Sequence, residues 1–192
     1  MSTRVEATTL APRVDLLTDV AFVLAGAALV AGAAQISVAL PFTPVPITGQ
    51  TFAVLLVGAA LGTVRGFASL LLYLLVGIAG APIYAHHAHG WSQVTSASGG
   101  YLVGFVVAAA VTGFLAEHRW DRRFSSSISL MLTGNVIIYA VGLPWLAVVL
   151  NTNLEKTLEY GLYYFVPGDI LKLYLAAALL PTAWKVTRRL DA

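Results

Sequence analysis

The 192-residue sequence contains no cysteine, and only 10% of its residues are charged. The absence of cysteine excludes disulfides, thiolate metal sites and cysteine nucleophiles. The sequence also lacks a glycine-rich loop ending in Lys-Ser or Lys-Thr, so it cannot hydrolyse ATP by the Walker route. Hydrophobic residues make up 58% of the chain, above the share of about 45–50% in soluble domains. The composition therefore predicts an integral membrane protein.

Apolar runs recur along the whole chain. The first could be mistaken for a secretory signal peptide, but several more follow, which favours a first membrane helix. Without a repeat or a linker, the sequence predicts one membrane domain at 18–186, between a cytoplasmic lead-in at 1–17 and a cytoplasmic tail at 187–192. The predicted fold class is all-α, with six transmembrane helices. These spans are expected at 18–36, 50–63, 66–80, 100–117, 126–150 and 168–186.

The distribution of Lys and Arg tests this number of spans, because cytoplasmic segments of membrane proteins carry an excess of both. With both termini cytoplasmic, nine of the 11 lie in inner segments, Lys156 lies in an outer one and Lys172 lies within a span. Omitting the second span would place Arg65 and the cluster at 119–123 outside. The predicted inner set is Arg4, Arg13, Arg65, Arg119, Arg122, Arg123, Lys185, Arg188 and Arg189.

An acid and a base begin the last span. Asp169 and Lys172 are three residues apart, so on a helix they share a face about one turn apart. Ionised groups at membrane depth are costly and seldom unpaired, which favours a functional site. The alternative is a first-turn acid stabilised by the helix dipole, with Lys172 reaching back to the lipid headgroups.

A proline-rich, uncharged segment precedes the second span. Three prolines at positions 41, 44 and 46 remove N–H donors and forbid a regular helix, so this segment is predicted to be extended. The following span is short for a bilayer, which indicates that the segment dips into the protein, where irregular backbone must be buried or line a cavity. Thr48, Gln50 and Thr51 then face that cavity or cap the helix.

Other polar and aromatic residues are further candidates for ligand contact. Tyr84 and Trp91 either anchor the chain at the membrane interface or stack on a ring. The glycine pair before Tyr101 lets another backbone or a ligand come close. Asn135, near mid-membrane, is expected to hydrogen-bond to another helix or to a ligand.

The outer loop after the third span contains three histidines, His86, His87 and His89. Imidazoles suit nickel, zinc or copper, but no carboxylate is nearby and adjacent histidines rarely converge on one ion. We predict no metal site there, and we keep metal uptake as an alternative function.

Small residues recur along the first span, many of them four residues apart, as at Ala21 and Ala25. Such spacing lets helix backbones approach closely in lipid. The two interpretations are packing within this protein and a docking face for another subunit, for which Ala21 and Ala25 are the candidates.

Together, these motifs resemble the BioY family, the biotin-binding S components of energy-coupling-factor (ECF) transporters. The resemblance runs from about residue 18 to residue 186. Family members usually have leucine where Gly49 stands and Pro-Thr at 97–98, and the outer loop here is rich in histidine. The motifs are Pro41–Thr51, Leu61-Gly62, Gly66, Tyr73, Gly77–Pro82, Gly99-Gly100-Tyr101 and Pro167–Lys172.

The resemblance implies an S-component-like bundle in a bacterial cell membrane, with an outward-facing vitamin pocket. It also implies a membrane scaffold (T) subunit, docked on the alanine-rich face, and two ABC-type ATPase subunits. Biotin would be the transported ligand, and neither catalysis, a cofactor nor a nucleic-acid partner is expected.

Biotin offers two ureido N–H donors, a ureido carbonyl, an apolar thioether ring and a carboxylate, so its site needs an acceptor, a donor, apolar walls and preferably a cation. Which end of biotin meets the acid and the lysine stays open. The candidate ligand-binding residues are Asp169, Lys172, Gln50, Tyr101, Asn135, Trp91 and Tyr84.

Two alternative functions remain besides biotin capture with partner ATPases. One is a nickel or cobalt uptake subunit that uses the outer-loop histidines. The other is a stand-alone, proton-coupled vitamin carrier with Asp169 as the titrating group. An enzyme ranks last, since the spans contain no plausible nucleophile–base pair.

Overall fold

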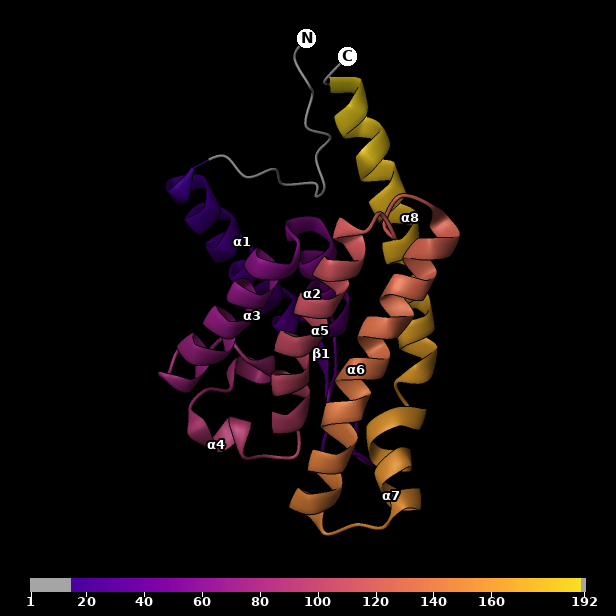
Figure 1. Cartoon of the computed structure of the whole chain (residues 1–192). Coiled ribbons are helices and arrows are strands. Elements are labelled where there is room, and N and C mark those ends of the chain that lie inside the picture. The colour runs from indigo at the N-terminus through magenta and orange to yellow at the C-terminus, as the bar shows by residue number, and fades with distance from the viewer. Residues whose placement is uncertain (1–14, 191–192) are drawn as a thin grey trace.

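The computed structural model describes the backbone of residues 15–190 and the side chains of residues 15–185. Arg4 and Arg13 of the predicted lead-in, and the side chains of Arg188 and Arg189, lie outside this part. Each of the six apolar segments forms a helix (Figure 1). The helices are α1 (Leu16–Gln35), α2 (Gln50–Leu61), α3 (Thr63–Ile78), α5 (Gly99–Glu117), α6 (Phe124–Leu150) and α8 (Val166–Leu190).

Four of these helices, α1, α5, α6 and α8, are long and apolar enough to cross a membrane. The other two are shorter, with 12 residues in α2 and 16 in α3. At 1.5 Å per residue they reach about 18 and 24 Å, less than a hydrocarbon core of about 30 Å. The shortness of α2 leaves room at its N-terminal end for the proline-rich segment.

Helix α5 lies at the centre of the bundle, between α1 on one side and α6 and α8 on the other (Figure 1). In its apolar span 67% of the residues are buried, against 17% in α1 and 22% in α8. Glycines make this close packing possible. A Cβ at Gly113 would lie 2.4 Å from the backbone of Gly62, and one at Gly58 would lie 2.5 Å from the carbonyl oxygen of Ala109. Larger residues would push α2 and α3 away from α5.

The proline-rich segment is held as a short hairpin. Strands β1 (Ser37–Val38) and β2 (Ile47–Thr48) pair antiparallel, with Ser37 opposite Thr48. The tip between them is fixed by tertiary contacts, since Thr43 Oγ1 donates to the carbonyl oxygen of Tyr160 at 2.6 Å. The extended backbone was predicted from the prolines, whereas the strand pairing was not.

The two loops at the hairpin end of the molecule contain short helical pieces. Between α3 and α5 lie η1 (Ala85–His87) and α4 (Trp91–Val94). Between α6 and α8 lie α7 (Leu154–Leu158) and η2 (Glu159–Tyr163). The first of these loops is tied to the end of α1, because Gln35 Nε2 donates to the carbonyl oxygens of Ile83 and Tyr84 at 3.2 and 3.1 Å. Both loops therefore pack over the same end of the bundle.

Ionic contacts fasten the opposite end. Asp19 of α1 pairs with Arg65 of α3. In the loop between α5 and α6, Asp121 accepts a hydrogen bond from the indole of Trp184, and the Arg122 guanidinium lies 3.4 Å from the centre of that ring. Burial raises the pKa of the Asp121 carboxyl above its usual range, which the Trp184 hydrogen bond partly opposes. These contacts hold α1 to α3 and α8 to the α5–α6 loop.

The turn between α2 and α3 combines a glycine with a distant acid. Gly62 has φ +84° and ψ −179°, a conformation open essentially to glycine alone. Because glycine offers no capping side chain, the Glu117 carboxylate takes that role and accepts from Thr63 N at 2.8 Å and Thr63 Oγ1 at 2.9 Å. Glu117 thus joins the end of α5 to the start of α3.

We predict that Glu117→Ala lowers the free energy of unfolding by about 1–2 kcal/mol, the usual cost of losing a helix cap. For a chain of this size that corresponds to a drop in Tm of about 2–8 °C. Thermal unfolding in detergent measures it. Glu155→Ala, which removes an exposed acid from the first turn of α7, is the control and should leave the Tm nearly unchanged. Equal shifts in the two variants would contradict the capping role.

Candidate functional site

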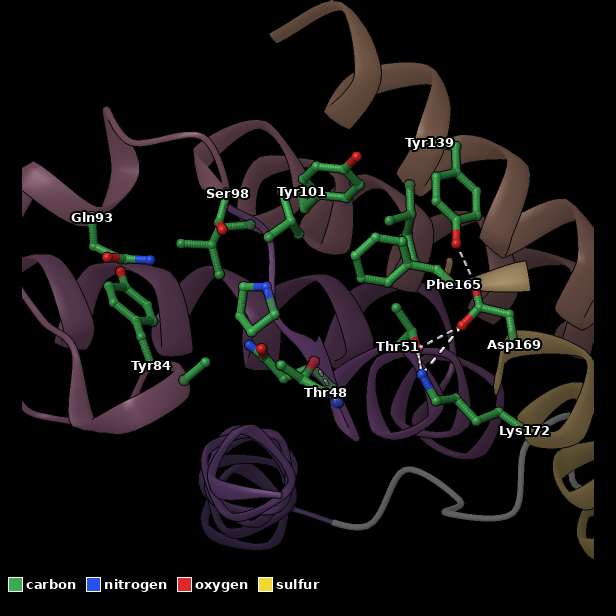
Figure 2. Close-up of a pocket in the computed structure, with 16 residues that line it drawn as sticks. Thr48, Thr51, Tyr84, Gln93, Ser98, Tyr101, Tyr139, Phe165, Asp169 and Lys172 are labelled. Carbon is green, nitrogen blue, oxygen red and sulfur yellow. Dashed lines mark hydrogen bonds and ion pairs between the residues drawn. The ribbon is translucent and has the colours of Figure 1, made fainter. Parts of the chain in front are cut away.

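A cavity opens where the hairpin, the loop between α3 and α5, and helices α2, α5, α6 and α8 meet (Figure 2). Its volume is about 60 Å³. Only two of its 16 lining residues, Asp169 and Lys172, are charged. The other lining residues are Val45, Pro46, Thr48, Gln50, Thr51, Tyr84, Ala85, Gln93, Ser98, Tyr101, Leu102, Ile138, Tyr139 and Phe165.

The charged pair sits in the first turns of α8. Helix α8 begins at Val166, and Pro167, which has no N–H to leave unsatisfied, suits its first turn. The spacing of three residues puts Asp169 and Lys172 on one face, with Lys172 Nζ 3.2 Å from Asp169 Oδ1. The lysine side chain is only 20% exposed and turns into the bundle. This geometry contradicts the alternative in which Lys172 reaches to the lipid headgroups.

Two neighbouring helices supply further hydrogen bonds to this pair. From α2, Thr51 Oγ1 accepts from Lys172 Nζ at 3.0 Å and lies 3.5 Å from Asp169 Oδ1. From α6, the Tyr139 hydroxyl donates to Asp169 Oδ2. Figure 2 shows the four side chains pointing toward one another. Buried ion pairs are tolerated when such hydrogen bonds satisfy their remaining donors and acceptors.

A second set of hydrogen bonds orients Gln50, at the start of α2. The hydroxyl of Tyr73 donates to the Ile83 carbonyl oxygen at 3.3 Å and accepts from Gln50 Nε2 at 2.8 Å. Because the amide nitrogen of Gln50 donates to Tyr73, the amide oxygen of Gln50 is the group that remains to accept from a ligand. The N-cap of α2 is Gly49, and Thr48 just before it accepts from Gln50 N through its Oγ1 at 3.2 Å.

Two tyrosines form firm walls because their hydroxyl groups bond to backbone. Tyr101 donates to the carbonyl oxygen of Gly161 at 2.9 Å, and its ring meets that of Tyr139 edge to face at 6.3 Å. Tyr84 donates to the Leu74 carbonyl oxygen at 2.6 Å. Burial raises the pKa of Tyr84 to about 12, so this phenol stays neutral. Both rings present carbon rather than charge to the cavity.

Five of the seven candidate residues line this cavity, namely Asp169, Lys172, Gln50, Tyr101 and Tyr84. The other two do not. Trp91, on the short helix α4, is 65% exposed. Asn135 is buried and lines a smaller, adjoining cavity of about 10 Å³, which Thr51 and Lys172 also line. Its amide oxygen has no hydrogen-bond partner among the described residues, so the hydrogen bond to another helix that the sequence predicted for this oxygen is absent.

Several lining residues were not among the seven candidates. Thr51 had been expected only to face a cavity or to cap a helix. Tyr139 lies one turn beyond Asn135 on α6, a spacing that could have indicated it. Gln93, Ser98 and Phe165 are brought to the cavity by loops, and neither spacing nor composition marks them.

The three histidines of the loop between α3 and α5 do not gather into a cluster. His86 Nδ1 lies 3.2 Å from Ser37 Oγ, and His89 Nδ1 lies 3.3 Å from the carbonyl oxygen of His87. Within residues 15–185, no three His, Asp or Glu side chains come close enough to hold a metal ion. The polar chemistry of the cavity therefore rests on Asp169, Lys172 and their neighbours.

The fold and the cavity define a class: a multi-pass, α-helical membrane protein with a buried polar cavity between its helices. Comparison with known families is more specific. The model of the BioY family matches residues 2–189, nearly the whole chain, and the chain belongs to this family.

Two relatives and one solved structure support this assignment. The Biotin transporter BioY of Rhizobium etli is 34% identical over 149 residues, which cover 74% of this chain and 79% of the relative. The Probable biotin transporter BioY of Pyrococcus horikoshii is 34% identical over 161 residues, covering 84% and 93%. The crystal structure of the S-component for biotin from an ECF-type ABC transporter superposes with a TM-score of 0.80. At 24% identity, covering 88% of this chain and 92% of that one, this structure shows the shared fold.

We predict that Asp169 and Lys172 are energetically coupled even without ligand. Lys172→Met alone leaves a buried carboxylate without its cation and should be strongly destabilising. In the Asp169→Asn background the same change should cost less, by about 1–3 kcal/mol. Chemical unfolding in detergent of the unchanged protein, Lys172→Met, Asp169→Asn and the double variant measures this difference.

The pair Lys156 and Glu159 is a matched control, with the same spacing and an N–O distance of 3.0 Å. Both side chains are exposed, so Lys156→Met and Glu159→Gln should combine almost additively. If the two changes at Asp169 and Lys172 also added within about 0.5 kcal/mol in the free energy of unfolding, their pairing would not contribute to stability.

Proposed function

We propose that this chain is the biotin-binding S component of an ECF transporter and mediates biotin uptake with ATP hydrolysis supplied by partner ATPases. The observation that carries the proposal is the pair of a buried Asp169 and a partly buried Lys172 on a cavity whose other walls are neutral. The names of the relatives, which describe biotin transporters, supply the ligand.

The charges suggest how biotin is oriented. The ureido head offers two N–H donors and one carbonyl, which match the Asp169 carboxylate and the Lys172 ammonium. The biotin carboxylate would gain little at this pair, because Asp169 already balances the charge of Lys172 and would itself repel a second carboxylate. We therefore place the head at Asp169 and Lys172, the thioether ring against Phe165 and Tyr101, and the tail toward Gln93 and Ser98, which lie at the other end of the cavity in Figure 2.

The lining has to move when biotin binds. A cavity of about 60 Å³ holds about four water molecules, which is too little for a bicyclic vitamin. The segments that can give way are the hairpin and the loop between α3 and α5, since neither is part of a long helix. His86 and His87 in that loop adopt left-handed φ values of 57° and 59°, which are costly for residues other than glycine.

The positions of the charges support a cytoplasmic location for both termini. The end of the bundle opposite the cavity includes Arg65, Arg119, Arg122, Arg123 and Lys185, whereas the two loops at the cavity end have Lys156 alone among the described Lys and Arg residues. By the positive-inside rule the cavity then faces outward. In this orientation we expect all six helices to cross the bilayer of a bacterial cell membrane, α2 with the help of the proline-rich segment before it and α3 with the help of the loop after it.

The exposed face of α1 supports a docking role for the small residues. Ala21, Ala25, Ala28 and Gly32 are all exposed, whereas Gly26, Ala27, Val30 and Ala34 are buried. The sequence has no Walker loop for ATP hydrolysis, and we propose that other subunits supply the energy. We propose that this face docks the membrane scaffold subunit, which in turn binds two ABC-type ATPases.

Calorimetric titration of biotin into purified variants tests the site. Lys172→Ala and Asp169→Asn should each weaken binding at least tenfold, because each removes a charge-assisted hydrogen bond worth about 1.5–3 kcal/mol. Lys156→Ala removes the exposed outer lysine and should leave the dissociation constant unchanged. Unchanged affinity in both site variants would refute the site.

Replacing His86, His87 and His89 together with alanine should change biotin affinity less than about tenfold, or 1.4 kcal/mol.

Bulky substitutions on α1 test the docking face. Ala21→Trp or Ala25→Trp should block co-purification with the scaffold subunit and abolish uptake, because a large side chain prevents close helix contact. Biotin binding to the isolated chain should be unaffected. Val20 is also exposed but lies about 100° around the helix from Ala21, so Val20→Trp is the matched control. Loss of biotin binding with assembly intact would contradict this assignment.

A further inference from the structure

The end of the cavity away from Asp169 and Lys172 has no fixed positive charge. Figure 2 shows Tyr84, Gln93 and Ser98 at this end, and all three side chains are neutral. The Tyr84 hydroxyl is already committed to the Leu74 carbonyl oxygen. The side chains of Gln93 and Ser98 can both donate and accept hydrogen bonds.

The surrounding sequence supplies no Lys or Arg either. Residues 66–118, which form α3 beyond Arg65, the following loop and α5, contain neither residue type. On the neighbouring outer loop Lys156 is paired with Glu159 at 3.0 Å and lies 5.4 Å from the centre of the Tyr160 ring. At the opposite end of the cavity, the charge of Lys172 is balanced by Asp169. The cavity as a whole is therefore close to electrically neutral.

We propose that this protein binds biotin compounds with an uncharged, amide-type tail about as well as it binds free biotin. This inference rests on the proposed function, and it names the chemical class of ligand that the cavity takes. An amide tail can accept from and donate to Gln93 and Ser98, as these side chains have both kinds of group. A site with a fixed cation would instead favour the carboxylate roughly ten- to hundredfold, the worth of a charge-assisted hydrogen bond.

Competition binding tests this inference. Radiolabelled biotin bound to the purified full-length chain is displaced with unlabelled biotin or with biotin primary amide. The expected ratio of the two dissociation constants is within about threefold. A more than tenfold weaker binding of the amide, with biotin itself bound normally, would overturn this inference alone. Failure of biotin itself to bind would overturn the proposed function and this inference with it.

A variant that adds the missing charge makes the test sharper. Gln93→Arg should create a preference of at least tenfold for free biotin over the amide. The matched control Gln93→Met, of similar length and without charge, should weaken both ligands alike and keep their ratio near one. An unchanged ratio in Gln93→Arg would show that the ligand tail does not reach this end of the cavity, and would overturn the inference.

Discussion

The ion pair between Asp169 and Lys172 constrains the cavity end of this molecule. Two opposite charges at membrane depth are tolerated only when each is paired and hydrogen-bonded. The partners come from different helices, with Thr51 from α2 and Tyr139 from α6. Helices α2, α6 and α8 must therefore converge at one point, and the cavity lies beside it. The same contacts that accommodate the two charges thus also bring together the walls of the candidate site.

Such convergence depends on how closely the other helices pack. Gly58 and Gly113 let α2 and α3 lie directly against α5. The ion pair of Asp19 with Arg65 and the hydrogen bond from Trp184 to Asp121 fasten the far end. The long helices are thereby fixed at the end away from the cavity. The cavity end is closed by a hairpin and two loops, the parts that we propose move when a ligand enters. The fixed ends of the helices and the segments that we propose to move thus lie at opposite ends of the bundle.

Local patterns in the sequence predicted much of this arrangement. The six helices follow from apolar runs that are interrupted by glycine, proline and charge, and the pairing of Asp169 with Lys172 follows from a spacing of three. Contacts between distant segments could not be predicted in this way. Tyr139 meets Asp169 only because α6 and α8 cross near that point, and the hairpin tip is fixed by Tyr160, more than a hundred residues away. Trp91 faces outward and Asn135 lines the adjoining cavity because the packing of α4 and α6, rather than residue type, sets the direction of a side chain.

Equilibrium binding of biotin, thiamin and riboflavin to the purified, full-length chain tests the central claim most directly. A neutral cavity with one acid–lysine pair suits a compact ligand that has both ureido donors and a carbonyl. The account predicts saturable binding of one biotin per chain and no measurable binding of thiamin or riboflavin at the same concentrations. Absence of biotin binding, or equal binding of all three vitamins, would contradict it.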